Sequence, residues 1–462
     1  MRKPKLLIAN RGEIACRVLA AARLLGLPTV ALHSRPDAEL PHVALADEAC
    51  ALDGTRAQET YLDVDRVLAA ARETGATLLH PGYGFLSENA DFARRCRDEG
   101  IVFVGPSPEA IDLMGDKEQA RRTAAAAGVP VLPGTARLPD DAEGLARAAR
   151  ELEFPLLVKS AAGGGGIGMR IVKEPGELEA AVRSTRALAG KAFGDDSVYL
   201  ERYVARARHV EVQVFGFGDG EAVHLHERDC SLQRRHQKVI EEARAPGLSS
   251  ELTSDIARAA VALAKACRYE GAGTVEFLVD ADTGRFYFLE MNTRIQVEHP
   301  VTEMITGVDL VAAQLRQALG ESLQGELAQS AIRASGHAVE ARVYAENPAK
   351  NFLPSPGPLR VLDLPRSDGV RVDCGYAAGN TVTPYYDPMI MKVIAAGPTR
   401  AAAIDRLAAA LQDLRIEGVA NNAAYLLACL RHPEFAAGNV YTAFLSDRHG
   451  DIVASASRDA QP

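Results

Sequence analysis

Three side chains with metal-binding oxygens lie on two neighbouring β-rich segments in the second half of the chain. Glu276 stands in the segment 274–280, and Glu290 and Asn292 stand in the segment 286–292. A short polar break that contains a glycine separates them, which predicts a β-hairpin. Residues two apart on a strand leave the same face, so Glu290 and Asn292 point together, and the hairpin brings Glu276 near Glu290. Oxygen ligands alone are typical of a Mg²⁺ (or Mn²⁺) site.

Polar residues continue at a spacing of two after this hairpin, at Arg294, Gln296 and Glu298. A cation beside a metal site favours an anionic substrate, and a carboxylate beside that cation is a candidate general base. The alternative interpretation is that scattered charges on a strand form a solvated face. The apolar run 286–289 on the same strand favours burial instead.

Composition excludes several classes of protein. The 462 residues are 47% hydrophobic with a net charge of -9, which suits two to four domains and leaves no basic footprint for nucleic acid. The 7 cysteines are scattered without a C-x-x-C pair, which argues against disulfides or zinc and indicates a reducing compartment. No apolar run has the length of a signal peptide or a membrane span, so we expect a cytoplasmic protein without a membrane partner.

The N-terminal part of the chain alternates strands and helices. Residues 6–9 and 29–32 have the pattern of buried strands and 14–25 that of a helix, which predicts a doubly wound α/β sheet. The first turn holds only Gly12, whereas a dinucleotide site requires G-x-G-x-x-G, so we exclude an NAD site. Tyr83 follows a further predicted strand, where open α/β sheets bind ligands; the alternative is a tight turn with a packing tyrosine.

A glycine run, Gly163, Gly164, Gly165 and Gly166, follows a strand that ends in Lys159. Consecutive glycines are entropically costly in an ordinary turn, but they suit a flap whose backbone N–H groups wrap phosphate oxygens. The lysine precedes the loop, and the loop joins two strands, so this is not a Walker A loop. Lys159 would supply a point charge for phosphate. The alternative is a flexible linker.

The interpretation of other polar residues depends on such a site. His209 alternates with Glu211 and Gln213, so the three share a face that either lines the cleft or is solvated. The charge-dense segment 227–242 alone indicates a solvated turn, but beside an ATP-type site His236 and Lys238 become candidates for holding an anion. Arg342 lies in a strand pattern and therefore requires a partner or an anion. From about Ser446 we expect a frayed polar tail.

Five motifs together resemble the biotin carboxylase component of biotin-dependent carboxylases, within the ATP-grasp superfamily. They are residues 8–14 (IANRGEI), 80–89 (HPGYGFLSEN), 163–166 (GGGG), 228–238 (RDCSLQRRHQK) and 290–303 (EMNTRIQVEHPVTE). The resemblance covers nearly the whole chain. The last motif is highly specific, whereas the glycine run alone is a weak signal.

The resemblance implies three domains and assigns a role to each candidate residue. It implies an α/β N-terminal domain at 1–116, an α+β ATP-grasp domain at 117–330 with a mobile lid at about 131–204, a β-rich C-terminal domain at 331–446 and a tail at 447–462. It places ATP binding, besides the glycine run, at Lys117, Lys159, Glu201, His209, Gln233 and His236. It places the Mg²⁺ ligands at Glu276, Glu290 and Asn292, and the bicarbonate pocket at Lys238, Arg294, Gln296 and Val297. It makes Glu298 the base for bicarbonate and Arg342 the stabiliser of the biotin enolate, with Tyr83 near the biotin ring.

The implied activity is the ATP-dependent carboxylation of biotin with bicarbonate through carboxyphosphate, the first half-reaction of an acyl-CoA carboxylase. No Met-Lys-Met-type attachment motif occurs, so we expect biotin on a separate carrier protein and a separate carboxyltransferase subunit. Ile167 stands where the family usually has a cation, and Ala20 where bacterial relatives often have an arginine at the dimer contact, which weakens the expectation of a homodimer. The alternatives are the same half-reaction for a two-subunit pyruvate carboxylase, or a non-catalytic ATP-binding regulatory subunit.

Overall fold

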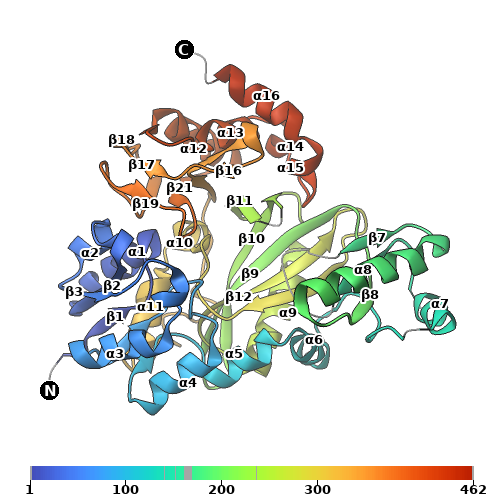
Figure 1. Ribbon diagram of the computed structural model, residues 1–462, viewed down its shortest axis with the longest axis horizontal. Helices are drawn as coiled ribbons and strands as arrows, with labels where there is room; N and C mark the ends of the chain where they lie inside the picture. Colours follow the sequence, from blue (N-terminus) through green and yellow to red (C-terminus); the bar gives the residue numbers. More distant parts are fainter. Residues whose placement is uncertain (1–2, 140, 151, 161–168, 236, 460–462) are drawn as a thin grey trace.

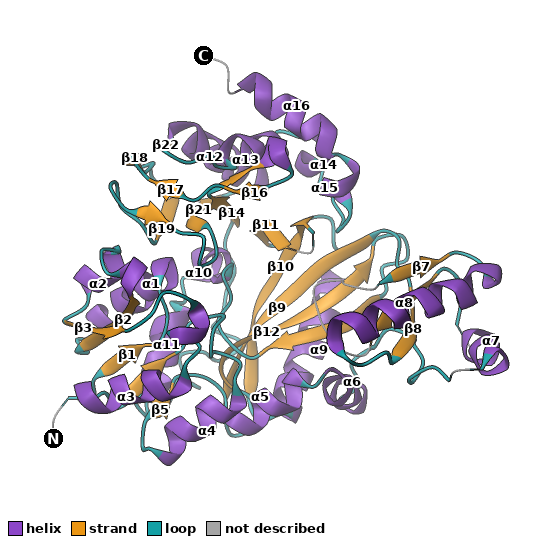
Figure 2. Ribbon diagram, viewed as in Figure 1, coloured by secondary structure: helices purple, strands orange, loops and turns teal. Residues whose placement is uncertain are grey.

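The computed structural model describes residues 3–139, 141–150, 152–160, 169–235 and 237–459. Figure 1 shows the N-terminal lobe in blue and the lid strands in green on opposite sides of the long central strands, with the C-terminal elements in orange and red above them. Figure 2 shows that helices cover sheets in all of these parts. The predicted fold class, α/β followed by α+β and a β-rich C-terminal part, is confirmed.

The N-terminal lobe is built on a parallel sheet with the strand order β3-β2-β1-β4-β5. Its elements are β1 Leu6–Ile8, α1 Gly12–Leu24, β2 Thr29–Ser34, η1 Arg35–Asp37, α2 Pro41–Leu45, β3 Glu48–Leu52, η2 Ala57–Glu59, α3 Val64–Thr74, β4 Leu78–His80, α4 Ala90–Asp98, β5 Val102–Phe103 and α5 Pro108–Gly115. Leu6 and Ile8 pack in one core with α1, whereas Leu7 packs in another with α3 and α4. Helices therefore cover both faces, as a doubly wound sheet requires.

The lid segment has a small antiparallel sheet and a hydrophobic core of its own. Its elements, after α6 Lys117–Ala126, are α7 Ala142–Arg150, β6 Leu156–Ser160, β7 Arg170–Val172, η3 Pro175–Glu177, α8 Leu178–Phe193 and β8 Val198–Arg202. The strand order is β7-β6-β8, and Val158 and Leu200 pack with Val182 of α8. The glycine run at 163–166 and Ile167 lie outside the described residues.

A long antiparallel sheet, here called the central sheet, passes through the middle of the molecule. Its strand order within the described residues is β13-β12-β9-β10-β11-β14-β21-β19. These strands are β9 Ala207–Phe217, β10 Ala222–Arg234, β11 Gln237–Ala243, β12 Glu270–Asp280, β13 Phe286–Asn292, β14 His337–Tyr344, β19 Val370–Cys374 and β21 Met389–Gly397. Helix α9, Ser250–Ala266, packs Ile256 and Leu263 against its valines. Helices α10, His299–Thr306, and α11, Leu310–Ala318, follow β13.

The C-terminal lobe adds short strands and helices around β14, β19 and β21. They are β15 Glu346–Asn347, η4 Pro348–Lys350, β16 Leu353–Pro354, β17 Gly357–Pro358, β18 Val361–Asp363, β20 Thr381–Val382, α12 Arg400–Asp413, β22 Arg415–Glu417, α13 Ala423–Leu430, α14 Pro433–Ala436, α15 Phe444–Asp447 and α16 His449–Asp459. The prediction of a frayed tail from Ser446 is wrong, because Ile452 and Ala456 of α16 join the core of this lobe. The apolar positions at a spacing of four form the buried stripe of a helix.

All 7 cysteines lie in the described ranges as free thiols. None of the helices in those ranges combines the length and the apolar character that crossing a bilayer requires.

His80, at the end of β4, makes the stability of the N-terminal lobe depend on pH. It is fully buried, its Nδ1 accepts a hydrogen bond from the backbone N–H of Gly82 at 3.0 Å, and burial lowers its pKa to about 4. Between pH 6.5 and 4, His80 binds a proton in the unfolded chain but not in the folded protein. The free energy of unfolding must therefore fall as the pH falls from 6.5 towards 4. We expect this residue alone to cost roughly 1 kcal/mol at about pH 5.5 relative to about pH 7.5.

Urea unfolding of the wild type and of His80→Gln at those two pH values checks this expectation. Glutamine keeps an acceptor but does not titrate, so the variant should lose stability on acidification by that much less. His42, whose pKa burial also lowers to about 4, contributes equally to both proteins and cancels in the comparison. An identical pH dependence in the two proteins would contradict the prediction.

Candidate active site

The predicted hairpin is formed by β12 and β13, with Glu276 directly opposite Glu290. Asn292 Nδ2 donates to Glu276 Oε1 at 3.0 Å, so the three candidate metal ligands lie together. The expectation of burial for 286–289 is wrong at Leu289, which is 37% exposed. A register irregularity between Glu276 and Phe277 offsets the alternation of faces along the hairpin.

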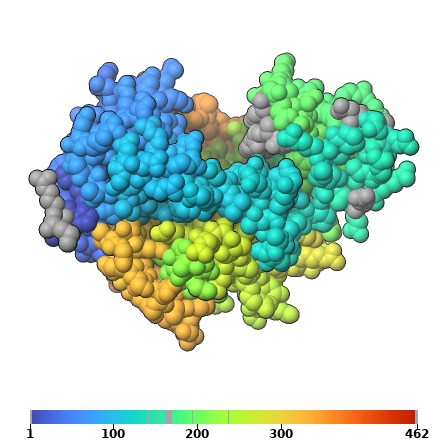
Figure 3. All heavy atoms as spheres, turned by 90° about the horizontal axis from the view of Figure 1, so that it is seen from below, coloured from blue at the N-terminus to red at the C-terminus, as the bar shows by residue number. Residues whose placement is uncertain are grey.

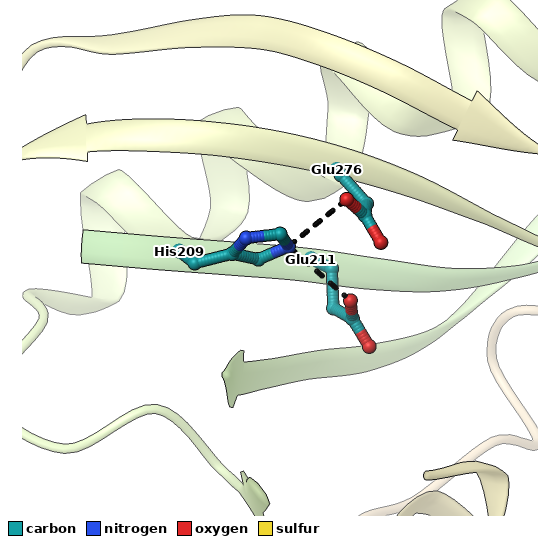
Figure 4. Close-up of side chains that lie close together, drawn as sticks. All are labelled: His209, Glu211 and Glu276. Carbon is teal, nitrogen blue, oxygen red and sulfur yellow. Dashed lines mark ion pairs between the residues drawn. The ribbon is translucent and has the colours of Figure 1, made fainter. Parts of the chain in front are cut away.

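His209 and Glu211 of β9 lie beside Glu276, as Figure 4 shows. His209 Nε2 lies 3.1 Å from Glu276 Oε2 and 3.6 Å from Glu211 Oε2. Burial opposes a charge on the imidazole, but Glu276 and Glu211 outweigh it and raise the pKa of His209 to about 9. The polar face of β9 is therefore a buried, ion-paired one and not a solvated one.

Glu290 shows that this corner of the site suits a cation. Glu290 keeps an exposed surface, but desolvation by the surrounding protein first, and then repulsion from Glu276, raises its pKa. A divalent cation bound by oxygen ligands relieves such repulsion. The donor set of Glu276, Glu290 and Asn292 therefore fits Mg²⁺ (or Mn²⁺).

Lys238 lies in a cage of three carboxylates. Its Nζ donates to Glu211 Oε2 at 2.6 Å, to Glu276 Oε1 at 2.8 Å and to Glu298 Oε1 at 2.6 Å. Burial opposes the ammonium charge, but the three carboxylates raise the pKa of Lys238 well above its ordinary value. The interpretation of 227–242 as a solvated turn is wrong, because β10 and β11 bury most of this segment and its charges pair with residues of other segments, as Arg234 does with Glu346. His236 lies outside the described residues.

Glu298 joins the Lys238 cage to Arg342 of β14. Glu298 Oε2 accepts from Arg342 Nη2 at 3.1 Å, and Arg342 Nη2 also lies 2.5 Å from Glu241 Oε1. Burial opposes ionisation of Glu298, but Lys238 and Arg342 hold its pKa below the usual range. Burial raises the pKa of Glu241 to about 7 against the opposing effect of Arg342. Glu298 is therefore an ionised carboxylate between two cations.

Arg228 of β10 is an organising residue that the sequence reasoning missed. It is fully buried, and its guanidinium donates to Glu211 Oε1 at 2.5 Å, to Gln213 Oε1 at 2.6 Å and to Gln296 Oε1 at 2.7 Å. Gln296 Nε2 in turn donates to Glu276 Oε1 at 2.8 Å. The available signal was the strict polar alternation of β9, because charged residues that alternate on a buried strand need a partner of opposite charge.

A cavity of about 510 Å³ is lined by residues expected at both the bicarbonate end and the biotin end of the site. Its lining includes Tyr83, Arg294, Val297 and Arg342, but not Lys238 or Gln296. Arg294 is anchored by Glu88, whose Oε2 accepts from Arg294 Nε at 2.7 Å. The sequence reasoning did not single out Glu88 as a partner.

Of the residues expected to bind ATP, Lys117 lines a second cavity of about 660 Å³, together with Arg121 and Tyr199. Lys159 Nζ donates to Glu201 Oε2 at 2.9 Å, and Arg121 Nη1 donates to Glu201 Oε1 at 2.6 Å. Gln233 Nε2 lies 3.0 Å from His209 Nδ1, which links Gln233 to the carboxylate cluster. Figure 3 shows the recess between the blue N-terminal lobe and the green lid.

Three family models match successive parts of the chain. The biotin carboxylase N-terminal domain matches residues 2–111, and the carbamoyl-phosphate synthase L chain ATP binding domain matches residues 116–326. The biotin carboxylase C-terminal domain matches residues 340–447.

Two curated proteins are similar in sequence to most of this chain. Biotin carboxylase 2 of Bacillus subtilis is 49% identical over 441 residues, 96% of this chain and 98% of that protein. The mitochondrial methylcrotonoyl-CoA carboxylase subunit alpha of Mus musculus is 47% identical over 458 residues, and this chain spans 64% of its length.

Solved structures agree with the fold. The biotin carboxylase domain of Hydrogenobacter thermophilus 2-oxoglutarate carboxylase, solved as a dimer with MgADP, ADP and bicarbonate, has a TM-score of 0.90 and 43% identity, covering 97% of this chain and 98% of that one. Biotin carboxylase of Campylobacter jejuni has a TM-score of 0.90 and 41% identity, covering 96% and 98%. The chain belongs to the biotin carboxylase family of ATP-grasp ligases.

Proposed function

We propose that this chain carboxylates biotin on a separate carrier protein, with ATP and bicarbonate, as the first half-reaction of an acyl-CoA carboxylase. The observation that carries the proposal is the position of Glu298, 2.6 Å from Lys238 Nζ on one side and 3.1 Å from Arg342 Nη2 on the other. A carboxylate between the bicarbonate end and the biotin end of the site serves both halves of the chemistry.

The chain holds the reactants with residues from several elements. ATP is bound by Lys117, Lys159, Glu201, His209 and Gln233, together with His236 and the glycine run of the lid. Mg²⁺ would be held by Glu276, Glu290 and Asn292, and when bound it would neutralise part of the negative charge on the transferring phosphoryl group. The lid over 131–204 closes on the nucleotide and excludes water from the labile carboxyphosphate.

The carboxylation of biotin takes place in the cavity that Tyr83 lines. Bicarbonate is held by Arg294, Lys238, Gln296 and Val297. Glu298 removes the proton of bicarbonate while a bicarbonate oxygen attacks the γ-phosphate of ATP. ADP leaves, and carboxyphosphate breaks down to CO₂ and phosphate. The released phosphate takes the N1 proton of biotin, and Arg342 stabilises the enolate charge while N1 attacks CO₂.

The proposed organisation follows the predicted boundaries: an N-terminal domain at 1–116, the ATP-grasp domain at 117–330, the C-terminal domain at 331–446 and a terminal segment at 447–462. A biotin carboxyl carrier protein and carboxyltransferase subunits would complete the enzyme in the cytoplasm, and a homodimer is the proposed state of this subunit. The free cysteines support a reducing compartment.

A second candidate function is the same biotin carboxylation step in a pyruvate carboxylase, where the carboxyl group passes to a different final acceptor. The biotin carboxylase subunit of a pyruvate carboxylase is similar to this chain with a TM-score of 0.86 and 42% identity. The carboxyltransferase that co-purifies with the chain distinguishes the two. A non-catalytic regulatory role is disfavoured, because Lys238, Arg294, Glu298 and Arg342 are all present and brought to one cleft.

The test is ADP release by the purified chain with Mg²⁺, ATP and bicarbonate, with and without free biotin. Bicarbonate-dependent release that rises with biotin supports the proposal. ATP binding without bicarbonate-dependent turnover would overturn it in favour of the regulatory subunit.

Replacing Arg342 by serine separates the two halves of the reaction. Biotin-dependent ADP release should fall by about 10²-fold, because the enolate loses its preorganised cation. Biotin-independent ATP cleavage should fall far less. Arg415→Ser, which removes an exposed arginine paired with Glu417, is the matched control and should change neither rate. Equal losses in both assays would contradict the enolate role.

A further inference from the structure

Lys392 of β21 is a buried cation that the mechanism above does not use. Its side chain is fully buried. It stands directly across from Arg342 on β14 and from Asp373 on β19. Residues directly opposite on antiparallel strands project from the same face, so Lys392 points to the side of the sheet that carries Arg342.

The ammonium of Lys392 is aimed at the turn that carries the proposed base. Its Nζ donates to the backbone carbonyl of Val297 at 2.7 Å. Its carboxylate neighbours lie further away, with Glu13 Oε2 at 3.3 Å and Asp373 Oδ2 at 3.7 Å. The shortest contact of this lysine is therefore the one to the turn and not the one to a counter-ion.

A planar trans peptide makes this contact directional. The carbonyl of Val297 and the N–H of Glu298 belong to one peptide unit and point in opposite directions. Fixing the carbonyl on Lys392 therefore fixes where the Glu298 N–H points. Among the described residues no backbone carbonyl accepts a hydrogen bond from that N–H, so the orientation of the peptide decides what it can bind.

A second buried side chain holds the same turn. His299 is fully buried, and its Nδ1 lies 2.8 Å from the carbonyl of Gln296. Burial, followed by repulsion from Lys392, keeps the pKa of His299 well below its usual value, so its ring is neutral. The two successive carbonyls of the turn, at Gln296 and Val297, are thus both held by buried side chains from outside the hairpin.

The same lysine is linked to the loop at the biotin end of the site. Glu13, at the start of α1, pairs with Lys392 and accepts a hydrogen bond from the Tyr83 hydroxyl. Lys392 thus contacts the turn at Val297 directly and the loop at Tyr83 through Glu13, and Val297 and Tyr83 line the same cavity.

We infer that Lys392 is a positioning residue that sets the geometry of the bicarbonate pocket by holding the Val297–Glu298 peptide. The inference rests on the proposed function, because it assigns bicarbonate to that pocket. Lys392 does not touch the reactants. Its loss acts through the orientation of the Glu298 backbone and side chain.

The experiment is steady-state ADP release by the full chain carrying Lys392→Met, which keeps an unbranched side chain without a donor. The KM for bicarbonate should rise by about tenfold or more, since a buried hydrogen bond from a charged group is lost, while the KM for ATP stays within about twofold. Lys392→Arg, which keeps a charged donor, should recover most of the bicarbonate affinity. A rise of equal size in both KM values, or a loss in kcat alone, would overturn the inference.

Asp373→Asn is the matched control. It removes a counter-ion of Lys392 but leaves the contact to Val297 intact. Its KM for bicarbonate should remain within about threefold of the wild type, whereas a lysine that only balances buried charge would make the two variants equally defective. Should Lys392→Met fail to bind ADP as a folded protein, Lys392→Gln, whose amide falls one bond short of the carbonyl, replaces it with the same expected rise. A wild type without bicarbonate-dependent turnover would refute the proposed function, whereas an active wild type with an unaltered Lys392 variant would refute this inference alone.

Discussion

Glu298→Gln is expected to bind ADP with nearly unchanged affinity and to lose bicarbonate-dependent turnover by about 10²- to 10⁴-fold. Glutamine has a similar shape but cannot take the proton from bicarbonate. In the free protein Lys238 and Arg342 hold the pKa of Glu298 low, which makes it a weak base. An anion bound beside Arg294 adds negative charge next to Glu298 and partly neutralises the cations that stabilise this carboxylate. Substrate binding itself should therefore raise the pKa of Glu298.

Initial rates of ADP release against bicarbonate concentration, with ADP binding measured by calorimetry, check this prediction. Glu227→Gln is the control, because Glu227 is also a buried glutamate on the central sheet but pairs with Arg244 at 3.8 Å, outside the Lys238 cage. Its turnover should stay close to that of the wild type. If Glu298→Gln keeps most of its activity, another group is the base.

Arg228→Met is expected to have the largest effect on stability, lowering the free energy of unfolding by about 3–5 kcal/mol. The substitution removes the closest cation of the fully buried Glu211, which keeps Lys238 and the more distant His209, and it removes the donor to Gln296. Turnover should fall as well, since Gln296 loses the contact that fixes its amide. The change is measured by urea unfolding followed by far-UV circular dichroism. Tryptophan fluorescence cannot be used, because the chain has 0 Trp.

Two further variants make this prediction specific. Arg316→Met removes an arginine that donates to Glu321 and Glu326 at the surface, and it should cost less than about 1 kcal/mol. Combining Arg228→Met with Glu211→Gln removes both members of the buried pair and should restore part of the lost stability. A double variant as unstable as the sum of the two single ones would show that Arg228 does not act through Glu211.

Local patterns predicted much of the fold and the central part of the site. The two-residue spacing of Glu290 and Asn292 and the glycine-containing break were enough to place Glu276 opposite Glu290. The strand and helix repeats of the N-terminal lobe also gave its sheet, because each element there is set by residues close in sequence.

Contacts between distant segments could not be predicted in the same way. The segment 227–242 is polar in composition, yet it is buried because β9, β12 and β14 supply opposite charges from elsewhere in the chain. The helix α16 was missed because its few apolar residues matter only when α13 is beside them. The partners of Arg228 and Lys392 also come from several elements, and no spacing along one segment reveals them.

The central sheet has a consequence for dividing this protein into fragments. Strands β11 and β14 are paired from Ile240 opposite Ala341 to Ala243 opposite Ala338, so backbone hydrogen bonds cross from the ATP-binding part into the C-terminal part. A fragment that stops before β14 would expose a row of unpaired N–H and C=O groups along β11, which is a template for aggregation. The two parts are therefore one cooperative unit despite matching separate family models. A soluble fragment is better obtained by removing the lid sheet, β6 to β8, than by cutting along the seam between β11 and β14.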